Sequence, residues 1–273
     1  MTADALPRRE KTPAQRYRHS LWLLTKRDLQ VRYTTSALGY VWSILDPLLM
    51  SVIYYFVFVV LFQRGDLTEQ PYIVFLMCAL LPWTWFNGSV NDMAKAFIRE
   101  AKLIRSTSIP RTIWVARIVL SKGIEFIASI PVLIVFALIS LVTADPAHLQ
   151  WTVVWVPLAI IIEAALIFGI GLILAPIVVF FRDLERAIKL VLRLLFYATP
   201  IVYGLAKFDN HATIKAVLDF NPLTGIMGIY RGAFFTGEVD WFAILISAIW
   251  AIVILGVGIL LFRRNVRAVL KEL

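Results

Sequence analysis

Six long apolar runs dominate this sequence and restrict its fold more than any other feature. Each is close to the roughly 20 residues that an α-helix needs to cross about 30 Å of hydrocarbon. The runs lie at approximately 37–62, 71–90, 113–141, 151–181, 187–206 and 241–262. They lack the alternation of a membrane β-barrel. The sequence therefore predicts an all-α membrane protein with six transmembrane helices.

The composition excludes the other broad classes of protein. Hydrophobic residues make up 60% of the 273 residues and charged residues only 16%, against about 45–50% and about 25% in soluble domains. A soluble or disordered chain is therefore ruled out. The single cysteine, Cys78, cannot form an internal disulfide, and the three histidines lie far apart in sequence. We expect no metal site.

The distribution of positive charge predicts the orientation. Of the 27 Lys and Arg residues, 21 lie in the two terminal segments and in the segments around 91–112 and 182–193, whereas only 4 lie in the three alternate loops. Cytoplasmic loops carry this excess, so both termini are predicted to be cytoplasmic. The same bias explains the net charge of +9 without nucleic acid.

Residues 14–36 have the pattern of a basic amphipathic helix. Tyr17, Leu21 and Leu24 fall on one face, and Asp28 precedes Arg32 by four residues, which is the favourable order for an ion pair. One interpretation is a helix lying on the cytoplasmic leaflet. The other is a collar around a cytoplasmic entrance, in which Asp28 and Arg32 face something other than lipid.

The segment 91–109 is predicted to form a short amphipathic cytoplasmic helix. Met93, Phe97, Ala101 and Ile104 share one face, and the helix should end before Pro110. Such a helix between two spans can contact a soluble motor, or it can simply rest on the membrane.

The external stretch 204–240 contains a second apolar stripe. Leu223, Ile226, Met227 and Tyr230 follow the helix-start signal Asn221-Pro222. We expect external helices that are re-entrant or that lie in the outer interface before the last span.

Three charges lie inside apolar runs: Lys122, Glu125 and Glu163. Such charges are costly in a membrane and are candidates for function. Lys122 and Glu125, three residues apart, can pair with each other. Glu163 has no partner nearby in sequence, so it must meet another helix or a cavity, or be protonated.

Aromatic side chains gather in the first two runs. Tyr54 and Tyr55 lie in the first, and Trp83, Trp85 and Phe86 lie in the second. They form either an interfacial belt or the lining of a pore, where rings would stack on the C–H faces of sugars.

Motifs of catalysis and nucleotide binding are missing. The sequence contains no Gly-x-x-x-x-Gly-Lys-Ser/Thr loop, no Gly-x-Ser-x-Gly and no His-Glu-x-x-His. We therefore expect no catalytic residue, no cofactor on this chain and a role as part of a pore or carrier.

Several ordered motifs are similar to those of the polysaccharide-export permeases of the ABC-2 type. The motifs are residues 27–33 (RDLQVRY), 36–42 (SALGYVW), 47–50 (PLLM), 81–86 (LPWTWF), 109–111 (IPR), 181–184 (FRDL), 198–203 (ATPIVY), 221–224 (NPLT) and 230–231 (YR). The resemblance covers nearly the whole chain from about residue 20. Exporters of O-antigen, teichoic acid, capsule and lipid-linked galactan are all similar, so the resemblance does not identify the sugar.

This resemblance implies a homodimer in a bacterial cytoplasmic (inner) membrane, surrounded by membrane lipids and driven by two separate ATPase subunits that carry ATP and Mg. It implies three parts: residues 1–36 as a cytoplasmic gate segment, 37–262 as the transmembrane domain and 263–273 as a basic tail. It further implies the following roles. The coupling residues are Phe97, Ala101, Lys102, Leu103 and Ile104; the gate residues are Arg27, Asp28, Arg32 and Tyr33; the channel rings are Tyr54, Tyr55, Trp83, Trp85, Phe86 and Tyr203.

The function expected from these features is export of a lipid-linked polysaccharide. Two alternatives stay open. One is an ABC-2 exporter of a drug or small lipid. The other is an intramembrane enzyme acting on lipid-linked sugars, with Glu125 or Glu163 as acid or base.

Overall fold

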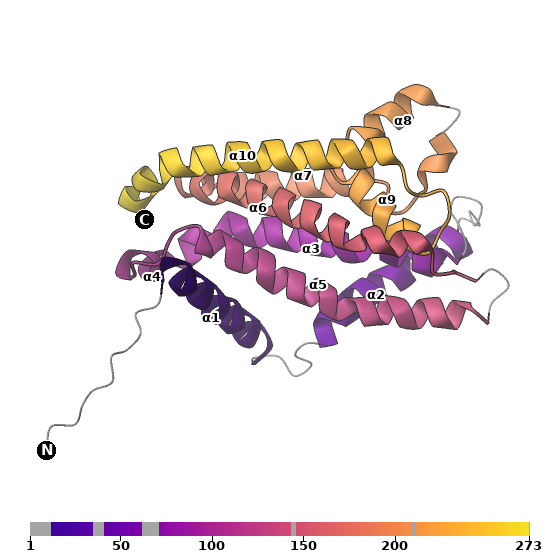
Figure 1. Cartoon of the computed structure of the whole chain (residues 1–273), viewed down its shortest axis with the longest axis horizontal. Coiled ribbons are helices and arrows are strands. Elements are labelled where there is room, and N and C mark those ends of the chain that lie inside the picture. The colour runs from indigo at the N-terminus through magenta and orange to yellow at the C-terminus, as the bar shows by residue number, and fades with distance from the viewer. Residues whose placement is uncertain (1–11, 35–40, 62–70, 143–145, 209–210, 273) are drawn as a thin grey trace, which may run out of the picture.

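The computed structural model describes residues 12–34, 41–61, 71–142, 146–208 and 211–272. Throughout these residues the regular structure is helical. The long helices run side by side along the long axis of the molecule (Figure 1), with α6 against α10 and α3 against both α5 and α6. The predicted all-α membrane fold is confirmed at this level.

Four helices are long and apolar enough to cross a membrane. They are α3 (Tyr72–Arg99), α5 (Ile113–Ser140), α6 (Val156–Phe180) with the 3-10 turn Trp151–Trp155 before it, and α10 (Trp241–Glu272). At a rise of about 1.5 Å per residue, a helix of 25 residues spans about 38 Å. The long apolar runs of the sequence therefore produce these helices directly.

The two other predicted spans are not among these four helices. The described part of the first comprises α2 (Val41–Tyr55) and a π-helix, Phe56–Leu61. The fifth, predicted at 187–206, is α7 (Leu184–Ala198), which ends before Thr199-Pro200. Proline disfavours helix in the residue before it, and 15 residues reach only about 22 Å.

The start of the first helix and the end of the last helix lie near the same end of the bundle (Figure 1). Helix α1 (Pro13–Thr34) packs against α5 through Leu24 and Leu29, which are both buried. Helix α10 runs without a break into the residues predicted to form a separate tail at 263–273. The basic end of the chain is thus a helical extension of the last span.

The helices of the stretch predicted to be external lie at the opposite end of the bundle (Figure 1). They are α8 (Ala212–Asp219) and α9 (Thr224–Gly232), and the latter is buried along its whole length against α3, α6 and α10. The side chain of Asn221 accepts a hydrogen bond from the Leu223 N–H at 3.0 Å, just ahead of the first residue of α9. The predicted helix start is confirmed, and the predicted apolar stripe is buried within the bundle.

Glycines allow α6 and α10 to approach closely. A Cβ added to Gly258 would lie 2.5 Å from the carbonyl oxygen of Gly169, and one added to Gly169 would lie 2.7 Å from the backbone nitrogen of Leu255. Small residues give membrane helices this kind of backbone contact.

We expect Gly258→Ala to destabilise the protein, because its methyl group would separate α6 from α10. The expected loss is about 1–3 kcal/mol, the usual cost of overpacking. Gly256→Ala is the matched control on the same helix, since a Cβ there meets nothing within 4 Å. Thermal unfolding in detergent measures both. Equal midpoints for the two variants would contradict the packing.

Candidate functional site

A first charge cluster joins α1 to the end of α3 and the start of α5. Its members are Arg27, Asp28, Glu100 and Arg117. Arg117 lies 2.7 Å from the Asp28 carboxylate and 3.3 Å from that of Glu100, and Arg27 pairs with both carboxylates as well. The Arg117 side chain is only 5% exposed. The two cations and two anions therefore neutralise each other in a contact that is partly shielded from water.

A second charge cluster lies farther along α1. It consists of Arg32, Asp92, Lys122 and Glu125. Arg32 lies 2.9 Å from Asp92 on α3 and 3.1 Å from Glu125 on α5, and Lys122 lies 3.0 Å from Glu125. This cluster is also neutral overall. Glu100 directly follows the last residue of α3. The two clusters therefore link α1 by charge to α5 and to α3 or the residue after it, in addition to the apolar packing of α1.

A cavity of about 510 Å³ lies beside these contacts. Its lining includes Arg27, Asp28 and Arg32 from α1, together with Asp92 and Arg117. The cavity lets water reach part of each cluster. Ion pairs that are partly hydrated separate at lower cost than fully buried ones.

The structure changes the partners that the sequence predicts. The pair of Lys122 with Glu125 is confirmed. Asp28 and Arg32 instead turn to other helices, because Arg117 is available to Asp28 and Glu125 to Arg32. Both do face something other than lipid, as one of the two interpretations required. The side chain of Tyr33 lies outside the described residues.

Burial raises the pKa of the Asp28 carboxyl above its ordinary value, although Arg117 and Arg27 pull the pKa down. The charge on Asp28 therefore depends on its cationic neighbours. Sequence reasoning missed Asp92, Glu100 and Arg117 as members of these clusters. The available signal was Arg117, a cation five residues before Lys122 inside an apolar run.

A buried polar contact, separate from the two charge clusters, lies in the opposite half of the bundle. Glu163 of α6 is fully buried and accepts a hydrogen bond of 2.9 Å from the hydroxyl of Tyr230 on α9. Its other carboxylate oxygen has no hydrogen-bond partner among the residues that the structure describes. Glu163 thus meets another helix, which was one of the expected outcomes.

Arg231, the next residue on α9, is a buried cation that the sequence did not single out. Its guanidinium donates to the carbonyl oxygens of Ile201 at 2.7 Å and Tyr203 at 3.2 Å, and lies 3.7 Å from the ring centre of Phe75. These contacts fix the turn after α7 to α9 and α3. The role is structural.

We expect Tyr230→Phe to destabilise the protein by about 1–3 kcal/mol, the cost of leaving a buried polar group unpaired. Glu163 would then lose its hydrogen-bond donor. Thermal unfolding in detergent is the measurement, and Tyr197→Phe at an exposed position is the control. Glu163→Gln should cost less, because an amide oxygen still accepts from Tyr230. A larger loss for Glu163→Gln than for Tyr230→Phe would contradict this contact.

The predicted coupling segment is not one helix. Residues 91–99 extend α3, and a separate short helix, α4 (Ala101–Ser106), follows Glu100. Phe97 and Ile104 are buried inside the subunit. The ring centre of Phe97 lies 6.1 Å from that of Phe262 on α10. The apolar stripe therefore holds this segment to the bundle, and these two side chains are not available to a partner.

The outer face of α4 has a different character. Lys102 and Arg105 are exposed, while Ala101 and Leu103 are half-buried. Of the five predicted coupling residues, Lys102, Ala101 and Leu103 are therefore accessible to a partner. The accessible surface is basic rather than apolar.

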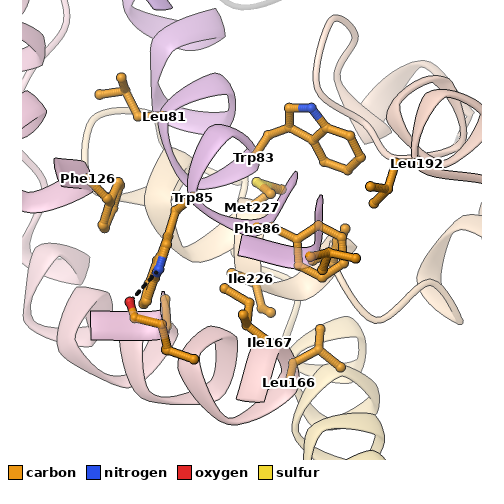
Figure 2. Packing of buried hydrophobic residues seen from close by; sticks show 14 of the residues in the cluster. Leu81, Trp83, Trp85, Phe86, Phe126, Leu166, Ile167, Leu192, Ile226 and Met227 are labelled. Carbon is orange, nitrogen blue, oxygen red and sulfur yellow. Dashed lines mark hydrogen bonds between the residues drawn. The ribbon is translucent and has the colours of Figure 1, made fainter. Parts of the chain in front are cut away.

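The aromatic cluster of α3 faces two directions, as its spacing predicts. Trp85 stacks on Phe126 with 5.3 Å between the ring centres, and its indole N–H donates a hydrogen bond of 3.2 Å to the Val119 carbonyl oxygen. Figure 2 shows Trp83 on the other side, beside Leu192. Trp83, Trp85 and Phe86 are only 5%, 4% and 2% exposed, so all three predicted channel rings of α3 are buried within the subunit.

The remaining predicted rings lie nearer the surface. Tyr54 is half-buried and stacks on Phe196 of α7 at 5.7 Å, and Tyr55 is exposed. The hydroxyl of Tyr203 donates to the Tyr197 carbonyl oxygen at 3.1 Å. These rings gather around α2 and α7.

Comparison with known proteins identifies the family. Residues 19–235 match the family described as ABC-2 type transporter. The chain belongs to the ABC-2 type transporter family. The matched residues run from α1 to the end of α9, so both charge clusters and the buried Glu163 contact belong to this ABC-2 domain. A transport role and a multi-pass membrane location follow.

Curated relatives of this ABC-2 permease include three with informative names. The O-antigen export system permease protein RfbA of Klebsiella pneumoniae is 35% identical over 89% of this chain and 91% of the relative. RfbA of Myxococcus xanthus is 31% identical over 80% and 81%. The polysialic acid transport protein KpsM of Escherichia coli is 24% identical over 90% and 93%.

Proposed function

We propose that this chain is the permease subunit of an ABC transporter that exports a lipid-linked polysaccharide across the bacterial inner membrane. The observation that carries the proposal is the similarity, over about nine tenths of both chains, to a permease named for O-antigen export. The homology to a polysialic acid transport protein is consistent with the same class of cargo.

The active unit is a homodimer bound to two ATPase subunits. This sequence has no phosphate-binding loop of the Walker type, so ATP must be bound by a separate chain. One subunit also offers too few helices to enclose a sugar chain. A pathway between two copies solves that problem.

Six spans with both termini in the cytoplasm form the topology of each subunit. The two spans beyond the four long helices are α2 with its π-helical extension, and α7. The excess of Lys and Arg at the ends of α1, α3 and α10 supports this orientation.

Helix α1 is the cytoplasmic gate, and the two charge clusters are its closed-state contacts. Because each cluster is neutral and partly hydrated, α1 can leave without stranding a fully buried charge. The basic face of α4 is the surface that meets the ATPase. The rings around α2 and α7 line the path of the sugar chain.

The alternative of an intramembrane enzyme has less support. Glu125 is held between Arg32 and Lys122, and Glu163 is enclosed against Tyr230. A general acid or base must reach a substrate proton, and both carboxylates are engaged within the subunit.

Reconstituted vesicles test the proposal. The permease and the ATPase encoded with it are expected to export a labelled lipid-linked polysaccharide in an ATP-dependent manner, and mass measurement should give two copies of each chain. A stable monomer that transports fully without an ATPase would overturn the proposal.

A further inference from the structure

A groove of about 420 Å³ lies between α2, α3 and α7. Its lining combines aromatic rings with cations. The cations are Lys189 and Arg193 of α7, and the rings include Tyr54 and Tyr197. Asn87 of α3 adds an amide.

The cations of this groove are incompletely neutralised. Arg193 is exposed and has no ion pair among the residues that the structure describes. Lys189 lies 2.9 Å from Glu185, but that carboxylate is shared with Lys95, also at 2.9 Å. No carboxylate belongs to the described lining of the groove. The local charge is therefore positive.

The positive charge of the groove lies next to aliphatic side chains. Leu190, Val191 and Leu194 of α7 are all exposed, so the cations lie beside exposed aliphatic side chains of the same helix. Lys189 and Arg193 belong to the segment predicted to be cytoplasmic, so they lie near the inner surface of the membrane, where cations attract anionic groups. An anion held in the groove would neutralise them.

The rings stand in register with the cations. Lys189, Arg193 and Tyr197 follow each other at intervals of four residues, so they form a stripe with steps of about 6 Å along α7. Tyr54 stacks on Phe196 beside them at 5.7 Å. An anionic group at the start of this stripe and a ring-binding group at its end would fit one elongated molecule.

We propose that this groove binds the junction between lipid and sugar in the cargo. Lys189 and Arg193 bind the phosphate that links the two parts, and Tyr54 and Tyr197 contact the first sugar. This inference rests on the proposed function, and it names the part of the cargo that the permease recognises. A phospholipid headgroup also carries phosphate but lacks the sugar for which the rings are placed.

Binding to the assembled transporter tests the proposal. The complex of permease and ATPase is placed in nanodiscs of neutral lipid, and the probe is a fluorescent polyprenyl diphosphate that carries one N-acetylglucosamine. The variant K189Q/R193Q is expected to bind the probe at least about tenfold more weakly, since charge-assisted bonds to phosphate are lost. The matched control is Arg186→Gln, an exposed cation of α7 outside the groove, and its affinity should stay at the wild-type value.

A second pair of measurements separates sugar from lipid. Tyr197→Ala should weaken binding of the sugar-bearing probe more than binding of the same diphosphate without sugar. Equal losses for both probes, unchanged binding by K189Q/R193Q, or equal competition by phosphatidylglycerol would each overturn the assignment.

Wild-type transport keeps the two proposals distinguishable. If the wild-type complex exports lipid-linked polysaccharide while K189Q/R193Q binds the probe normally, only the groove assignment fails. If the wild-type complex neither binds the probe nor exports, the proposed function and the groove assignment fail together.

Discussion

Replacing Arg117 with alanine is expected to lower the unfolding midpoint of the protein by roughly 6–12 °C. Arg117 neutralises Asp28 and Glu100 from a nearly buried position. Removing one partner of a buried ion pair costs about 3–5 kcal/mol, and we take the lower end because both carboxylates are partly exposed. About 3 kcal/mol corresponds to that shift for a chain of this size.

The loss should depend on pH. Without Arg117, the pKa of Asp28, already raised by burial, rises further. A carboxyl whose pKa is higher in the folded state binds more protons when folded, so the stability that this provides is present at low pH and lost as pH rises through the folded pKa. The difference in unfolding midpoint between Arg117→Ala and wild type should therefore become smaller as the pH is lowered from 8 to 5.

Thermal unfolding in detergent, followed by tryptophan fluorescence, measures this effect. Arg263→Ala, an exposed cation of α10, is the control and should shift the midpoint by about 1–2 °C at most. A midpoint for Arg117→Ala equal to that of the control would show that α1 is not held by the first charge cluster.

Much of the fold follows from the sequence because the membrane permits few solutions. The apolar runs predict the long helices, and the apolar stripes predict that α1 and α9 are helical. The length of α7 could not be predicted in this way. Hydropathy does not show that a helix stops before Thr199-Pro200 and that the chain then turns back, with Arg231 held to the carbonyl oxygens of the turn.

The polar contacts were predictable only within a single helix. Lys122 and Glu125 lie three residues apart, so their pairing could be foreseen. The contacts of Arg32 with Glu125, or of Tyr230 with Glu163, join residues 93 and 67 positions apart, and no local pattern encodes them. The stripe through Phe97 and Ile104 was correctly seen as apolar, but its spacing could not show that it faces the subunit rather than a partner.

The last prediction concerns the proposed contact between the basic face of α4 and the ATPase. Lys102→Glu combined with Arg105→Glu is expected to reduce copurification of the ATPase at least about tenfold and to abolish export. Both side chains are exposed, and reversing two charges in a contact turns attraction into repulsion. The unfolding midpoint should stay close to that of the wild type, since surface substitutions change stability by about 0.5 kcal/mol or less.

Ile104→Ala provides the contrasting variant on the same helix. Ile104 is fully buried, so its truncation should cost about 2–5 kcal/mol of stability while the fraction that remains folded still binds the ATPase. Affinity capture of the ATPase, done alongside thermal unfolding of the same preparations, separates the two effects. If the double charge reversal lowers the midpoint as much as Ile104→Ala does, or leaves ATPase capture and export unchanged, then the exposed face of α4 is not the coupling surface.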